Sequence, residues 1–135
     1  MILNFPQLNG MLLKDRFFQV LHEEKVNSNE AVYLCELKAD CDVYTGHFPG
    51  KPVSPGVCNI EMIRECAEML VGQDLLIDTI KQCRLTAVAS PAVCPKVDVR
   101  VMVARVEGTD SYNIVASIAD ASTSYMEMKG TLAIG

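Results

Sequence analysis

One helix that is apolar on almost every side is the feature that most constrains how this chain folds. Ser54 is a good N-cap, Pro55 suits the first helical position, and helix-forming residues continue to Gly72. The apolar residues of this segment are Val57, Cys58, Ile60, Met62, Ile63, Cys66, Ala67, Met69, Leu70 and Val71. The polar residues form one narrow stripe at i, i+3, i+4 and i+7, namely Glu61, Arg64, Glu65 and Glu68. A helix with so little polar surface is expected to be wrapped by a sheet.

The remainder of the chain is typical of β-strands separated by polar turns. Strands are predicted over residues 16–24, 31–39, 79–88, 97–106, 111–119 and 124–134, with a hairpin turn from Asn27 to Glu30. No internal repeat, linker or low-complexity segment interrupts the 135 residues. The pattern therefore predicts a single α+β domain over residues 1–135, with one helix among about six antiparallel strands.

The composition favours an oligomer. Half of the residues are hydrophobic and the mean hydropathy is +0.19, yet no uncharged run approaches the roughly eighteen residues that a membrane helix needs. We therefore expect part of the apolar surface to be buried between subunits and no membrane association. The first residues lack the basic region of a signal peptide and contain Asn4 and Pro6 where its apolar core would lie, which predicts a cytoplasmic protein.

The cysteines and histidines do not indicate a metal site. Six cysteines form no C-x-x-C pair, and His22 and His47 are the only histidines, so no cluster has zinc-ligand spacing. Reduced structural thiols are expected, and neither a metal nor an organic cofactor is expected.

Charge is distributed unevenly along the chain. The net charge is −5, which argues against a nucleic-acid partner, but residues 79–105 carry five basic side chains and one acidic side chain. The basic residues of this segment are Lys81, Arg84, Lys96, Arg100 and Arg105. They form either an ordinary solvated strand face or a docking patch for one acidic partner.

The stretch from Gly46 to Glu61 carries the groups that could perform chemistry. His47 lies in a proline-rich loop and can accept or donate a proton near neutral pH. The backbone N–H groups of Gly56 and Val57 at the helix N-terminus could hold a carbonyl oxygen that becomes anionic. Glu61, sheltered by apolar neighbours, could act as a general acid. A base, an oxyanion site and an acid together suit the elimination of water next to a carbonyl group.

The same stretch resembles the 3-hydroxyacyl-(acyl-carrier-protein) dehydratases of the FabZ type. Their signature is approximately G-H-F-P-x-x-P-x-x-P-G-V-x-x-x-E, and this chain matches it from Gly46 to Glu61 with the same fourteen-residue separation of His47 and Glu61. In having glutamate at position 61 the chain resembles the FabZ enzymes, since the related FabA enzymes have aspartate there. The resemblance is strong over about residues 44 to 70, and Cys58 and Asn59 stand where the family usually has apolar residues.

The resemblance implies a hotdog fold, in which an antiparallel β-sheet wraps a long central helix. It also implies a homodimer, possibly assembled as a trimer of dimers, in which His47 of one subunit faces Glu61 of the other. The substrate implied is a 3-hydroxyacyl chain on acyl carrier protein. Lys81, Arg84, Lys96 and Arg100 are then candidates for docking this acidic partner.

Alternatives remain for the two most distinctive side chains. Glu61 could simply pair with Arg64 on a solvated helix face. Cys58, in the first helical turn, could be a nucleophile with a lowered pKa, although a buried packing role is commoner. The corresponding functions are a hotdog thioesterase that uses Glu61 with water, and a catalytically silent acyl-binding subunit.

Overall fold

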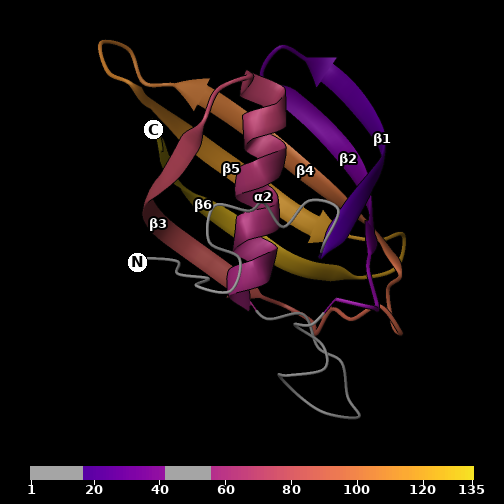
Figure 1. Cartoon of the computed structure of the whole chain (residues 1–135). Coiled ribbons are helices and arrows are strands. Elements are labelled where there is room, and N and C mark those ends of the chain that lie inside the picture. Colours follow the sequence, from indigo (N-terminus) through magenta and orange to yellow (C-terminus); the bar gives the residue numbers. More distant parts are fainter. Residues whose placement is uncertain (1–16, 42–55) are drawn as a thin grey trace.

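The computed structural model describes residues 17–41 and 56–135. Within them the order is β1 (Phe18–Asn27), β2 (Glu30–Leu37), α2 (Gly56–Val71), β3 (Leu75–Leu85), β4 (Lys96–Arg105), β5 (Ser111–Ala119) and β6 (Ser124–Ile134). The strands form one antiparallel six-stranded sheet in the order β1-β2-β4-β5-β6-β3. The sheet curves around α2, which crosses its concave face (Figure 1). The predicted α+β fold with a wrapped helix is confirmed.

The alternation of side chains explains why the sheet has one buried face. Along β4, Val97, Val99, Val101 and Val103 are buried while the residues between them are exposed. Strands β5 and β6 contribute further apolar residues to the same face, where they meet the buried side of α2. Burial of this apolar surface is the main force that holds the helix against the sheet.

The C-terminal end of α2 agrees with the sequence pattern. The helix ends at Val71, and Gly72 follows with φ = +79°, a conformation that glycine adopts without strain. The Gly72 N–H donates to the Glu68 carbonyl at 2.7 Å, which closes the last turn. Ser54 and Pro55, predicted to begin the helix, lie outside the described residues.

Strand β3 begins earlier than predicted because Gly72 ends the helix abruptly and only three residues separate α2 from Leu75. The pairing of β3 with β6 is irregular at Asp78 and at Lys81, where the register shifts. Gly130 of β6 lies opposite Ile80, and an added Cβ there would lie 2.2 Å from the Thr79 carbonyl oxygen. The close approach of β3 to β6 therefore requires glycine at position 130.

Candidate active site

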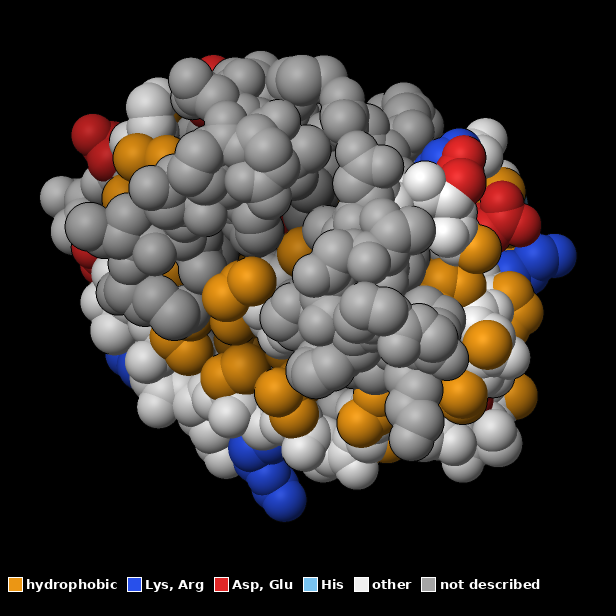
Figure 2. Space-filling view, turned by 60° about the horizontal axis from the view of Figure 1, so that its bottom comes forward, with side chains coloured by type: hydrophobic (Ala, Val, Ile, Leu, Met, Phe, Trp, Pro, Cys, Tyr) orange, Lys and Arg blue, Asp and Glu red, His pale blue; other side chains and the backbone are white. Residues whose placement is uncertain are grey.

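The N-terminus of α2 is described from Gly56 onward. Gly56 and Val57 are the first two helical residues, so their N–H groups have no acceptor within the helix. Among the described residues, the atom nearest to a Cβ added at Gly56 is Leu85 Cδ1, at 3.4 Å. Figure 2 shows hydrophobic side chains gathered at this end of the molecule, and Val57 and Leu85 are both exposed. The predicted base, His47, lies outside the described residues.

Glu61 lies about one and a half turns into α2 and is bound by Arg64. Arg64 Nε donates to Glu61 Oε1 at 2.8 Å, and Arg64 Nη2 donates to Glu61 Oε2. Both carboxylate oxygens therefore accept hydrogen bonds from one guanidinium group, which is the strong fork-like pairing of arginine with a carboxylate. The side chains of Glu61 and Arg64 are only 12% and 15% exposed.

Arg64 is itself anchored to the residues that follow the helix. Its Nη1 donates to the Leu75 carbonyl and lies beside Glu68 Oε2, each at 2.8 Å. Glu68 Oε2 in turn accepts the Leu75 N–H at 2.8 Å. The side chains of α2 and the first residue of β3 thus form one hydrogen-bonded network that ends at Glu61.

The alternative interpretation of Glu61, a pair with Arg64 on a solvated helix face, is correct only for the pairing. The predicted pairing with Arg64 forms, but the stripe does not face open solvent, since Glu65 is only 2% exposed and Glu61 is mostly buried. Burial acts to lower the pKa of Arg64, but the hydrogen bond and charge of Glu61 and the charges of Glu68 and Glu65 raise it above its usual value. The guanidinium group therefore stays charged.

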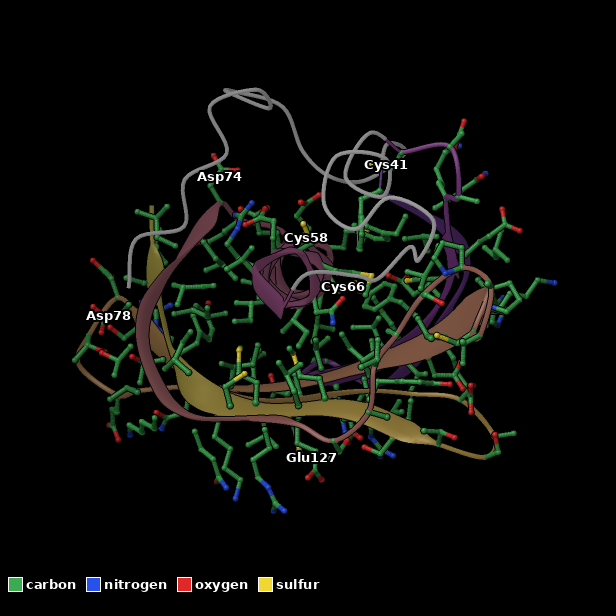
Figure 3. The ribbon with its side chains drawn as sticks, turned by 90° about the horizontal axis from the view of Figure 1, so that it is seen from below. Cys41, Cys58, Cys66, Asp74, Asp78 and Glu127 are labelled. Carbon is green, nitrogen blue, oxygen red and sulfur yellow. The ribbon has the colours of Figure 1, made fainter. Side chains whose placement is uncertain are left out.

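Cys58 has the environment of a packing residue. Its side chain lies in the core and is 1% exposed. Burial first, and then the nearby Cys41 and Glu61, raise the pKa of the Cys58 thiol to about 12. A nucleophilic cysteine needs the opposite shift, so the thiol is protonated at neutral pH and the packing interpretation holds. Figure 3 shows Cys58 on α2 and Cys41 beyond the end of β2.

Two of the predicted docking residues lie on the outer face of the sheet, on strands that are separated by β5 and β6. Arg84 on β3 and Arg100 on β4 line the same groove of about 310 Å³, together with Gln82, Met102, Val115, Ala116, Ser117, Glu127, Met128 and Lys129. Figure 3 shows Glu127 on this side of the sheet, away from α2. Lys81, at the irregular part of β3, and Lys96, at the start of β4, do not line the groove.

The arginines of the groove have carboxylate partners. Arg100 Nε donates to Glu30 Oε2 at 2.6 Å, and the Glu30 side chain is mostly buried. Arg84 lies 4.0 Å from Glu127, and both of these side chains are more than half exposed. Arg84 is therefore available to a partner, whereas Arg100 also compensates a buried carboxylate.

Sequence reasoning missed two features of these sites. The link from Arg64 to the Leu75 backbone joins residues eleven positions apart and has no sequence signature. Lys129 was missed as a groove residue. Glu127 and Lys129 are two positions apart on a predicted strand and so share one face of the sheet, which was a usable signal.

Comparison with known proteins identifies the family. Residues 23–124 match the ApeI-like family, described as ApeI dehydratase. The chain belongs to the ApeI-like dehydratase family. The matched range contains α2, the strands β2 to β5, the second half of β1, and the stretch from Gly46 to Glu61, and it ends at the first residue of β6. The predicted resemblance to FabZ-like dehydratases is confirmed.

Relatives of this ApeI-like chain with curated names are dehydratases. FabZ of Zymomonas mobilis, a 3-hydroxyacyl-(acyl-carrier-protein) dehydratase, is 37% identical over 70 residues, which are 52% of this chain and 41% of that protein. FabZ of Levilactobacillus brevis is 29% identical over 93 residues, which are 64% of this chain and 60% of that protein. The matches thus span about half of the length of these relatives.

Solved structures show the hotdog fold for this ApeI-like chain. The dehydratase heterocomplex ApeI:P from Xenorhabdus doucetiae superposes with a TM-score of 0.66 and 19% identity, over 85% of this chain and 96% of that chain. A hypothetical thioesterase from Streptococcus pneumoniae, solved with coenzyme A, superposes with a TM-score of 0.64 and 8% identity, over 90% and 89% of the two chains. Over residues 17–41 and 56–135, no helix has the length and apolar character needed to cross a membrane.

Proposed function

We propose that this protein dehydrates 3-hydroxyacyl thioesters of acyl carrier protein to trans-2-enoyl thioesters, in fatty acid or related acyl-chain synthesis. The observation that carries the proposal is the position of Glu61, a sheltered carboxylate on α2 about one and a half turns from the helix N-terminus. The family match and the FabZ-like spacing of His47 and Glu61 support it.

Each residue has one role in the proposed reaction. The N–H groups of Gly56 and Val57 hold the thioester carbonyl oxygen, which makes the C2 proton more acidic. His47 removes that proton, and the electron pair of the C2–H bond forms the C2=C3 double bond. The C3–O bond breaks, and the departing hydroxyl group takes a proton from Glu61 and leaves as water.

The site is proposed to be shared by two subunits of a homodimer. In the described sheet, β3 is the last strand and has a strand neighbour only on its β6 side. A strand edge with free N–H and C=O groups can pair with another strand, and Leu76 and Leu85 on β3 are exposed. Pairing of two β3 strands about a two-fold axis would create an isologous interface, and such dimers could assemble further into trimers of dimers.

Acyl carrier protein is proposed to dock by charge. Arg84 and Arg100 line the groove on the outer face of the sheet, together with Lys129, while Lys81 and Lys96 add positive charge on β3 and β4. An acidic carrier would be attracted to these cations, and the attraction would weaken with added salt.

A cytoplasmic location is part of the same proposal. The six cysteines, all among the described residues, form no disulfide, which fits a reducing compartment.

Thioester hydrolysis is the second candidate. The Glu61 side chain, held in place by Arg64, could activate water as a base, as a hotdog thioesterase requires. Hydrolysis would release a free thiol and a carboxylic acid, whereas dehydration keeps the thioester intact.

Product analysis separates these functions. The protein is incubated with a short series of 3-hydroxyacyl thioesters of pantetheine and of acyl carrier protein, and the products are followed by mass spectrometry and by a thiol reagent. Loss of one water without thiol release supports the dehydratase. Release of thiol supports the thioesterase, and binding without turnover indicates a silent subunit; either result contradicts the proposal.

A further inference from the structure

The guanidinium group of Arg64 is placed between Glu61 and two anchors. Toward Glu61, Nε and Nη2 donate to the two carboxylate oxygens. On its other side, Nη1 donates to the Leu75 carbonyl and contacts the Glu68 carboxylate, each at 2.8 Å. Arg64 would therefore keep its position even if its bonds to Glu61 were lost.

The surroundings of this group make its charge effective. The side chains of Arg64, Glu61 and Glu68 are 15%, 12% and 17% exposed, so water screens them only weakly. The anchors also come from two elements, because Leu75 begins β3 and its N–H binds Glu68. The network already holds the positive charge of Arg64 in place. Little rearrangement is therefore needed when a reaction develops negative charge beside it.

We propose that Arg64 is a positioning residue that stabilises the carboxylate of Glu61 as Glu61 gives its proton to the departing hydroxyl group. This inference rests on the proposed dehydratase function and adds a residue that lies outside the motif from Gly46 to Glu61. When the proton leaves, negative charge develops on the two Glu61 oxygens, and these are the atoms that Arg64 binds. The two hydrogen bonds from Arg64 therefore end on the atoms that carry the charge once Glu61 has given its proton.

The network also explains how Glu61 can be protonated again. Protonation removes the charge that attracts Arg64, and the guanidinium group can then remain with Glu68 and the Leu75 carbonyl. Glu68 thus acts as the alternative partner of Arg64 during the part of the cycle in which Glu61 carries its proton. Because Arg64 is shared between two carboxylates, the proton of Glu61 can leave and return without leaving a buried charge unpaired.

The test is a double-mutant cycle measured on 3-hydroxyacyl pantetheine thioesters. Arg64→Met is expected to lower kcat about 10- to 100-fold with little change in KM, because charge-assisted hydrogen bonds of this kind contribute on that scale. Arg64→Lys keeps the positive charge but not the paired hydrogen bonds of the guanidinium group, and it should recover part of the lost kcat. In a Glu61→Gln background, Arg64→Met should change kcat by no more than about twofold, because no charge then develops at position 61. The matched control is Arg105→Met, since Arg105 pairs with exposed Asp110 at 3.5 Å.

The outcomes are distinguishable. If the wild-type protein forms no enoyl thioester, the proposed function fails and the role of Arg64 fails with it. If the wild type is active and Arg64→Met keeps its kcat, only the role of Arg64 is overturned. Equal losses in the native and Glu61→Gln backgrounds, without recovery in Arg64→Lys, mean that Arg64 supports the fold and not the carboxylate.

Discussion

The substitution Gly130→Ala tests how β3 is held against β6. The added Cβ would lie 2.2 Å from the Thr79 carbonyl oxygen and 3.2 Å from the Ile80 Cα, whereas Cβ contacts under 3.0 Å essentially never occur. Both neighbours are backbone atoms, so no side-chain rotation can relieve the overlap and the strands must separate. Overpacking of this kind costs about 3 kcal/mol or more of the free energy of unfolding.

Gly72→Ala is the matched control for this substitution. Gly72 has φ = +79° and no atom within 4 Å of an added Cβ, so its replacement costs only the backbone strain of the left-handed conformation, about 1 kcal/mol. Urea unfolding at one protein concentration, followed by circular dichroism, gives both free energies. A Gly130→Ala variant as stable as Gly72→Ala would refute the inferred close approach of β3 and β6. A large loss should also lower activity, because β3 supplies the Leu75 anchor of Arg64.

Three further predictions address the thiol, the docking groove and the assembly. Cys58→Ala should keep kcat within about threefold of wild type, because burial raises the pKa of the thiol to about 12. Loss of turnover in a folded variant would instead support a nucleophilic role for Cys58. Arg84→Glu should raise KM for carrier-protein substrates, most strongly at low salt, and leave pantetheine substrates unchanged; equal effects on both would exclude docking. Light scattering at micromolar concentration should show a dimer or larger assembly, and a stable, active monomer would contradict the shared site.

Much of the fold could be predicted because local and long-range signals agree. The apolar helix ends at Gly72 as expected, and the alternation of valines along residues 97–103 shows which face of the sheet is buried. The irregular pairing at Asp78 and Lys81 could not be predicted, since it depends on how β3 meets Gly130 across the sheet.

The candidate site was predictable only as a set of residues. The spacing of Glu61 and Arg64 predicted their pairing, because residues three positions apart are neighbours on a helix. Spacing could not show that this face is sheltered or that Leu75 and Glu68 hold Arg64, since both depend on the path of the chain after Gly72. The predicted roles of His47, Gly56 and Val57 stay predictions, as does the choice among docking residues.

Mixing two inactive variants tests the central claim most directly, namely that His47 and Glu61 of different subunits form one dehydratase site. His47→Ala and Glu61→Gln should each lose about a hundredfold or more in turnover when assayed alone. In a heterodimer of the two, one site carries both substitutions and the other carries none. After subunit exchange, confirmed with labelled chains, each heterodimer should regain about half of the wild-type rate of enoyl thioester formation. Activity that stays at the level of the separate variants after complete exchange would contradict the account.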